Sequence, residues 1–256
     1  MTDNLPLILV VNDDGITAPG IQSLIEVAKE HGEVVVVAPD KPQSGMGHAI
    51  TLDAILNINK MEIEGVDAYA CSGTPVDCVK IAVNKILKRK PDLIVSGINH
   101  GSNSSINVIY SGTMSAALEG AMENIPSVGF SLLSHSIDAN FTAAKHYAHV
   151  LIKRLLSIPL PERICLNVNI PNVPKELILG IKVCRQAKAN WEEEYDERTD
   201  PMGRTYYWLT GNFVIDDEGE DTDEWALKNN YVSVVPVQYD ITNHSIIKDI
   251  KQLENG

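Results

Sequence analysis

The strongest constraint on the fold is an alternation of short apolar runs with longer amphipathic stretches over the first two thirds of the chain. Runs such as Leu7–Val11 and Val34–Ala38 have the length of one strand, whereas Ile21, Leu24, Ile25 and Ala28 recur at helical spacing. Strands that are buried on both faces form continuous apolar runs and are joined by helices. The pattern predicts a doubly wound, mostly parallel α/β sheet with helices on both faces.

Local signals place several elements within this pattern. Thr17 is expected to cap the first helix, and the segment 51–71 alternates apolar and polar residues around Glu64 and Gly65, which indicates antiparallel strands outside the main repeat. A further strand is expected over Leu93–Ser96, and a helix is expected to begin near Thr113. These elements complete a core over residues 1–171.

Residues 172–256 follow a different pattern, with scattered strand-like pieces separated by polar stretches. The window from Trp191 to Trp225 holds thirteen acidic residues against two arginines, and it contains seven of the fourteen aromatic residues. Disordered tails are poor in aromatic residues. We therefore expect a C-terminal β-hairpin or arm that packs on a partner subunit, with an intramolecular cap as the alternative.

Composition excludes several classes of protein. The formal charge of −13 disfavours nucleic-acid polymers and anionic membranes as partners. No apolar run is long enough to span a membrane, and the first residues lack the basic stretch and cleavage site of a signal peptide, so we expect a cytoplasmic protein. The four cysteines show no CxxC spacing, which favours buried thiols over a zinc site or a disulfide framework.

Three polar loops follow predicted strands and are expected to meet at the carboxyl edge of the sheet. They supply the neighbouring carboxylates Asp13 and Asp14, the hydroxyl of Ser44 and the amide of Asn99. Two adjacent carboxylates repel each other unless a cation neutralises them, and oxygen ligands suit Mg²⁺ or Mn²⁺. The loops therefore predict a divalent metal site, although Asn12–Gly15 is also typical of a plain solvated turn.

A second candidate site lies where a helix is expected to begin. Hydroxyls and a glycine over Tyr110–Thr113 precede a run of small residues, so backbone N–H groups and the helix dipole can hold an anion there. An ordinary helix cap explains the same residues. His100, between Asn99 and Gly101, is a candidate phosphate contact or proton donor, with a plain loop histidine as the alternative.

Together these motifs resemble the SurE family of survival-protein nucleotidases from Leu7 to about Ser245. Several separate motifs occur in the family's order. They are Val11–Ile16, Ala18–Gly20, Gln43–Gly45, Gly73–Val79, Pro91–Gly101, Tyr110–Thr113, Asp221–Asp223, Tyr231–Pro236 and Asp240–Thr242.

The resemblance implies a Rossmann-like catalytic core and a metal-dependent phosphatase that hydrolyses nucleoside 5′- and 3′-monophosphates, with short-chain exopolyphosphatase activity in some members. One divalent ion per subunit, Mg²⁺ or Mn²⁺, and a homodimer or homotetramer built by exchanged C-terminal elements are also implied. The family's metal ligands correspond to Asp13, Asp14, Ser44 and Asn99, and its phosphate-binding positions to Asn103, Ser111, Gly112 and Thr113.

Asp13 is the expected catalytic residue, as general base for water or as a nucleophile that forms an aspartyl-phosphate. His244, near Asp240, is an accessory candidate that would reach the site of a neighbouring subunit. A receiver-like phosphoacceptor signalling module is the alternative function, because it also carries an acidic pair after its first strand. The segments Leu93–Ser96 and Ser127–Phe130 do not end in the aspartate and lysine that a receiver needs.

Overall fold

A computed structural model describes residues 5–158 and 160–255 of the chain. In this described part, nine strands form one central sheet and two more form a separate hairpin. From one edge to the other, the central strands are β3 (Ile58–Ile63), β4 (Val66–Cys71), β2 (Glu33–Pro39), β1 (Leu7–Val11), β5 (Leu93–His100), β6 (Ser127–Leu132), β7 (Ile164–Ile170), β11 (Tyr231–Gln238) and β8 (Gly180–Val183).

The middle of the sheet is parallel, and one antiparallel pairing lies toward each edge. The strands from β4 to β7 in this spatial order all pair in parallel, whereas β3 is antiparallel to β4 and β11 is antiparallel to β7. Every residue of β1 and β6 is buried, as expected for strands covered on both faces. The predicted doubly wound, mostly parallel sheet is confirmed.

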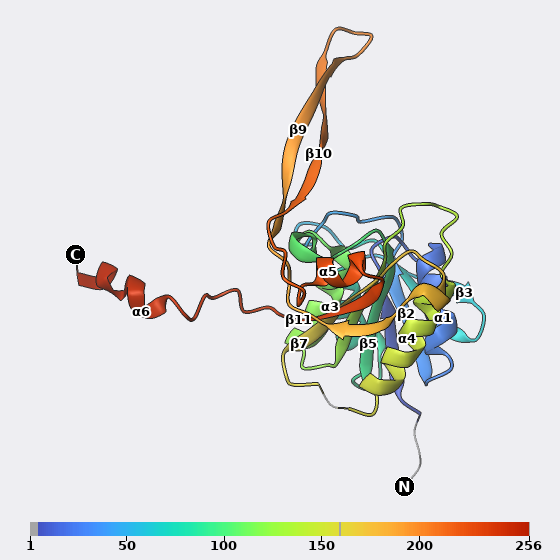
Figure 1. The fold of residues 1–256 in the computed structure, drawn as a ribbon. Helices are drawn as coiled ribbons and strands as arrows, with labels where there is room; N and C mark the ends of the chain where they lie inside the picture. Colours follow the sequence, from blue (N-terminus) through green and yellow to red (C-terminus); the bar gives the residue numbers. More distant parts are fainter. Residues whose placement is uncertain (1–4, 159, 256) are drawn as a thin grey trace.

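Helices cover both faces of the sheet (Figure 1). On one face α1 (Pro19–Ala28) contacts α4 (Thr142–Leu155), and on the other α2 (Pro75–Ile81) contacts α3 (Gly112–Met122). The two largest apolar clusters of buried side chains lie between the sheet and these helix pairs. The shorter helices α5 (Asp223–Lys228) and α6 (Ile247–Ile250) follow later in the chain, and α5 packs against β11.

Three local expectations need correction. The N-cap of α1 is Ala18 rather than Thr17, and its methyl side chain makes no capping bond; Pro19 follows as the first residue of the helix. The hairpin of β3 and β4 forms as predicted, but β4 pairs with β2, so the hairpin extends the main sheet. Strand β5 continues past Ser96 to His100, with an irregular register against β6 between Ser96 and Asn99.

The described part of residues 172–255 contributes β8 and β11 to the central sheet and also forms the predicted hairpin, β9 (Ala189–Thr199) and β10 (Thr205–Ile215). This hairpin projects from the body of the molecule, and the chain after β11 leaves it in another direction (Figure 1). All four cysteines are buried and free, as predicted. Within the described residues, no helix combines the length and apolar character needed to cross a membrane.

Candidate active site

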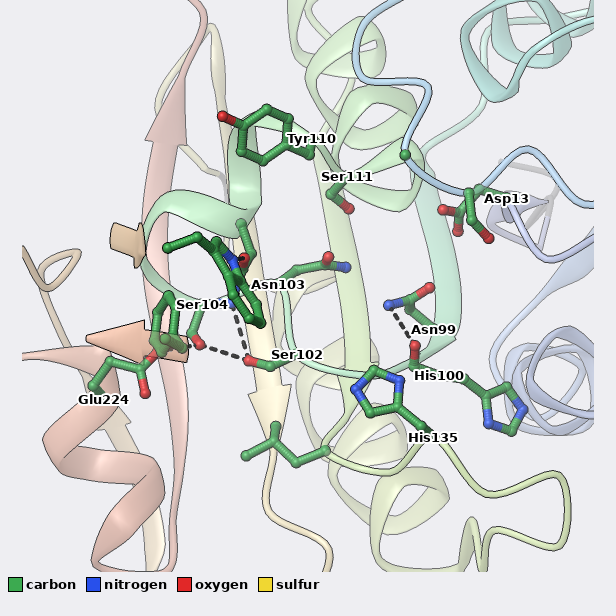
Figure 2. Close-up of a pocket in the computed structure, with 16 residues that line it drawn as sticks. Asp13, Asn99, His100, Ser102, Asn103, Ser104, Tyr110, Ser111, His135 and Glu224 are labelled. Atoms are coloured by element: carbon green, nitrogen blue, oxygen red, sulfur yellow. Dashed lines mark hydrogen bonds between the residues drawn. The ribbon is translucent and has the colours of Figure 1, made fainter. Parts of the chain in front are cut away.

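The candidate site lies where the order of the sheet reverses. Strand β2 follows β1 on one side, and β5 pairs with β1 on the other, so the carboxyl ends of β1 and β5 flank a topological switch point. A cavity of about 470 Å³ opens there (Figure 2). Its lining includes Asp13, Ser44, Gly45, Asn99, His100, Ser102, Asn103, Ser104, Asn107, Tyr110, Ser111, Leu133, His135, Trp191, Phe213 and Glu224.

Asp13 is the buried carboxylate of this cavity, with 4% of its surface exposed. The hydroxyl of Thr113 donates to its Oδ1 atom at 2.5 Å. Burial raises the pKa of Asp13 to about 6, the hydrogen bond from Thr113 opposes that rise, and the charge of Asp14 adds to it. The ionised form is therefore costly at neutral pH unless a cation lies nearby.

The start of α3 is built against Asp13. A Cβ atom on Gly112 would lie 2.6 Å from the Cβ of Asp13, so a glycine is needed for this close approach. Ser111 caps α3 by accepting the N–H of Met114 at 3.0 Å, as the simpler interpretation of this segment predicts, and it also lines the cavity. The segment thus provides a helix N-terminus beside the buried carboxylate.

The other predicted metal ligands come from neighbouring loops. The side-chain amide of Asn99 donates to the carbonyls of His100 and Gly101 at 3.2 and 3.0 Å, which leaves its Oδ1 atom on the side of Asp13 (Figure 2). The N–H of Gln43 donates to the backbone carbonyl of Asp13 at 2.7 Å and so ties the loop of Ser44 to this strand end. Ser44 itself lines the cavity.

The side chain of Asp14 differs from that of Asp13 in its burial and in its contacts. It is half-buried, does not line the cavity, and accepts the backbone N–H of His100 at 3.3 Å. Burial raises its pKa, and the hydrogen bond and charge of His100 oppose the rise. The two carboxylates therefore lie together at the end of β1, but only Asp13 contributes to the cavity wall.

The donor set fits a hard divalent ion. Carboxylate, amide and hydroxyl oxygens come from Asp13, Asn99 and Ser44, and a buried carboxylate with a raised pKa favours a positive neighbour. In addition, the Oδ1 atom of Asn12 is buried beside this loop without a hydrogen-bond partner among the described residues. These residues suit Mg²⁺ or Mn²⁺ better than a soft metal.

Two of the four predicted phosphate-binding residues line the cavity. Asn103 is held by bonds from its N–H to Asn169 Oδ1 and from its Nδ2 to Ser131 Oγ, both 2.8 Å. Ser111 joins it at the cavity wall. Thr113 and Gly112 lie against Asp13 and support its carboxylate, and their predicted contact with phosphate stays a prediction.

The accessory candidates lie in different places. His100 lines the cavity and packs edge-on against Phe141, with ring centroids 5.3 Å apart. Asp240 and His244 bond to each other at 2.8 Å on the exposed segment after β11, and neither lines the cavity of its own chain. Their approach to the site of a neighbouring subunit stays a prediction.

Several cavity residues have no local sequence signal. Trp191 and Phe213 face each other across the base of the hairpin, 5.3 Å between ring centroids, and Trp191 donates from Nε1 to Asn107 at 2.9 Å. Glu224 is half-buried and accepts the hydroxyl of Ser104 at 2.5 Å. Burial raises its pKa despite that bond.

His135 is a further lining residue that the sequence did not single out. A Cβ atom on Gly101 would lie 2.2 Å from its ring, so the glycine makes room for the imidazole at the cavity wall. The aromatic residues within Trp191–Trp225 indicated an ordered hairpin or arm, but no feature of the sequence predicted that some of them would line this cavity. All of these residues come from segments that only the folded chain brings together.

Comparisons with known proteins agree over nearly the whole chain. A sequence model described as "Survival protein SurE" matches residues 8–193. A curated relative from Flavobacterium psychrophilum, named 5′-nucleotidase SurE, is 62% identical over 245 residues, 95% of each chain. Another with the same name, from Christiangramia forsetii, is 61% identical over 98% of this chain and 97% of its own. The crystal structure of the SurE protein from Aquifex aeolicus is 42% identical, with a TM-score of 0.85 over 97% of this chain and 100% of that one.

Proposed function

The chain belongs to the SurE family, and we propose that it is a nucleotidase that hydrolyses nucleoside 5′-monophosphates, and also 3′-monophosphates, with the help of one divalent metal ion. The observation that carries the proposal is the buried carboxylate of Asp13 at the switch point of the sheet, among oxygen donors and beside a helix N-terminus. This combination suits a phosphate ester and a cation together.

The proposed metal ligands are Asp13, Asp14, Ser44 and Asn99. When bound, Mg²⁺ or Mn²⁺ would offset the charge of the phosphate and lower the pKa of a water molecule. Thr113 holds one oxygen of Asp13 through its hydroxyl, and Gly112 allows α3 to approach the same carboxylate. Contacts from α3 therefore hold the Asp13 carboxylate in position.

The phosphate is proposed to lie between Asn103 and Ser111 at the start of α3, where partial positive charge favours an anion. Asp13 then acts either as the base that takes a proton from the attacking water or as the nucleophile. Acid quenching with labelled substrate separates these roles, because only the nucleophilic route leaves phosphate on the protein. Positioning and electrostatics supply most of the acceleration in either case.

The nucleoside is proposed to occupy the part of the cavity lined by Tyr110, Trp191 and Phe213. Aromatic rings there offer a stacking surface for a base, and base stacking on aromatic residues tolerates different bases. The ribose would lie between this surface and the phosphate seat. A substrate that spans both regions explains why one cavity combines an aromatic side with an oxygen-rich side.

The test is phosphate release from a panel of nucleoside 5′- and 3′-monophosphates and short polyphosphate, after EDTA treatment and after addition of Mg²⁺ or Mn²⁺. Activity should return with metal, and Asp13→Asn should lower it by at least about 100-fold, since carboxylate ligand and reacting group are lost together. Asp53→Asn, an exposed residue outside the cavity, is the matched control. Folded protein that keeps phosphate covalently bound without release would support the receiver-like alternative instead.

A further inference from the structure

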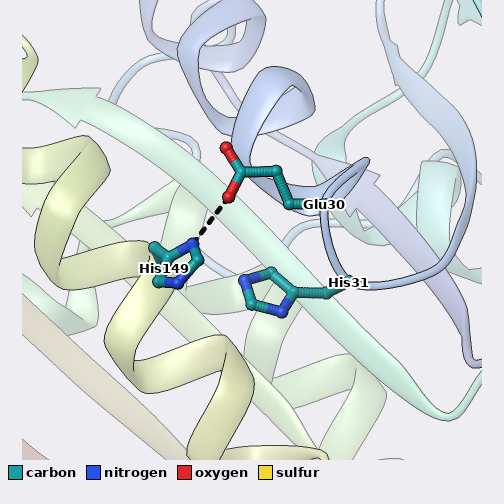
Figure 3. Close-up of side chains that lie close together, drawn as sticks. All are labelled: Glu30, His31 and His149. Atoms are coloured by element: carbon teal, nitrogen blue, oxygen red, sulfur yellow. Dashed lines mark hydrogen bonds and ion pairs between the residues drawn. The ribbon is translucent and has the colours of Figure 1, made fainter.

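A second cluster of metal-binding side chains lies away from the cavity. Glu30 and His31 follow the end of α1, and His149 lies on α4, the helix that packs against α1. One ligand atom from each residue lies within 4.8 Å of the other two (Figure 3). Among the described residues, no other group of three or more histidine, cysteine or acidic side chains brings its ligand atoms this close together.

The three side chains face one another. His149 Nδ1 and Glu30 Oε2 are 2.8 Å apart, and the imidazole rings of His31 and His149 have centroids 4.6 Å apart. One nitrogen of His31 points toward His149 (Figure 3). The Nε2 atom of His31 is shielded from water and has no hydrogen-bond partner among the described residues. A shielded imidazole nitrogen without a partner is costly in a structure unless a ligand satisfies it.

The surroundings of His31 favour its neutral form. Burial lowers its pKa, the charges of His149 and Lys153 lower it further, and Glu30 opposes them. Lys145, one turn before His149, is already paired with Glu26 of α1. A neutral imidazole has a free lone pair at neutral pH, which is the form that binds a metal ion.

We propose that Glu30, His31 and His149 bind one divalent ion of the zinc class and that this ion joins the end of α1 to α4. Two imidazoles and a carboxylate are a common three-residue ligand set for Zn²⁺, with water as the fourth ligand. Ligands of a tetrahedral ion at about 2.1 Å lie about 3.4 Å apart, so modest side-chain rotations from the present spacing suffice. Binding would replace the hydrogen bond between His149 and Glu30.

The ligand chemistry separates this site from the cavity. Nitrogen donors favour Zn²⁺, Co²⁺ or Ni²⁺, whereas the oxygen donors around Asp13 favour Mg²⁺ or Mn²⁺. Excess Mg²⁺ can therefore occupy the cavity while Zn²⁺ is titrated into the cluster. Occupancy of the two sites can be measured independently.

The experiment is a calorimetric titration of Zn²⁺ into untagged, metal-stripped protein in the presence of excess Mg²⁺. We expect one Zn²⁺ per chain, and at least a tenfold loss of affinity in His31→Ala and in His149→Ala. The melting temperature of wild type should rise with Zn²⁺, and the two variants should lose that rise. Circular dichroism without metal shows whether each variant is folded, and His149→Gln replaces His149→Ala if it is not.

Two controls test the location of the ion. Glu26→Gln removes the ion pair between Glu26 of α1 and Lys145 of α4 but none of the donors, so it should keep full Zn²⁺ affinity. Asp13→Asn should also keep it. Co²⁺ bound to wild type should show the intense visible absorption of a tetrahedral site, which the histidine variants lose. Equal Zn²⁺ affinity in wild type and both histidine variants, or no binding by wild type, would overturn the proposal.

Discussion

At the scale of single residues, the energetics of the site centre on Asp13. The rise of its pKa from the ordinary value of 3.8 to about 6 comes first from burial. The folded, metal-free protein therefore holds this proton more tightly than the unfolded chain does, so stability falls as the pH rises from about 4 through 6. Above that range the full cost of the buried charge is present, and a bound cation would offset it.

Asp13→Asn should therefore stabilise the metal-free protein at pH 7.5, because a neutral amide keeps an oxygen acceptor for Thr113 and carries no charge. The pKa change corresponds to at most about 3 kcal/mol. Thermal unfolding in EDTA between pH 4 and 8 measures the effect, and the gain should vanish near pH 4. Asp53→Asn serves as the exposed control, and a variant less stable than wild type at pH 7.5 would contradict the argument.

At the scale of elements, the buried carboxylate of Glu119 links α3 to α2 and to the loop that carries Ser44. Glu119 of α3 has 1% of its surface exposed, and it lies 3.0 Å from His48 Nε2 in the loop and 2.6 Å from Lys80 Nζ on α2. Burial raises the pKa of Glu119, but the hydrogen bond with His48 and the neighbouring ammonium group of Lys80 outweigh it and lower the pKa. These contacts position the loop relative to the cavity.

His48→Ala should therefore raise the metal concentration needed for half-maximal activity by about 10-fold, with a smaller change in kcat at saturating metal. The reason is that the loop of Ser44 loses its bond to α3. His48→Gln can still donate to Glu119 and should restore part of the metal affinity. Metal titrations of phosphate release measure both variants, and an unchanged metal requirement in His48→Ala would count against a positioning role.

At the scale of the whole molecule, the projecting hairpin exposes large apolar side chains of the kind that protein interfaces bury. Trp208 is 58% exposed and Leu209 62% exposed, and both lie on a strand that projects from the body. Acidic side chains fill much of the paired strand β9. Large exposed aromatic residues are unusual on a monomer and are enriched in interfaces, which favours the homodimer or homotetramer that the family resemblance implies.

Removal of residues 196–208, with an Asn-Gly turn joining Tyr195 to Leu209, should reduce the number of chains in the assembly. These two residues are cross-strand partners, so the shortened hairpin keeps its register and its cavity residues Trp191 and Phe213. Light scattering after size-exclusion chromatography measures the mass, and Trp208→Ser tests the aromatic contact alone. A deletion variant that assembles with the same number of chains as wild type would exclude the hairpin as the interface.

The sequence by itself determined the class of fold and the loops that carry the chemistry. Continuous apolar runs predict buried parallel strands, and the polar residues that follow them, such as Asp13 and Asn99, must then lie at one edge. Local composition also marked the acidic, aromatic hairpin. Each of these inferences depends only on residues close together in the chain.

The tertiary structure decided which distant residues share a site. Periodicity does not specify strand order, so the place of β1 between β2 and β5 follows only from the folded sheet. The contact of Thr113 with Asp13, the entry of Trp191 and Glu224 into the cavity, and the meeting of His31 with His149 all cross large separations in sequence. They depend on how whole elements pack, because packing sets the distances between side chains that are far apart in the sequence.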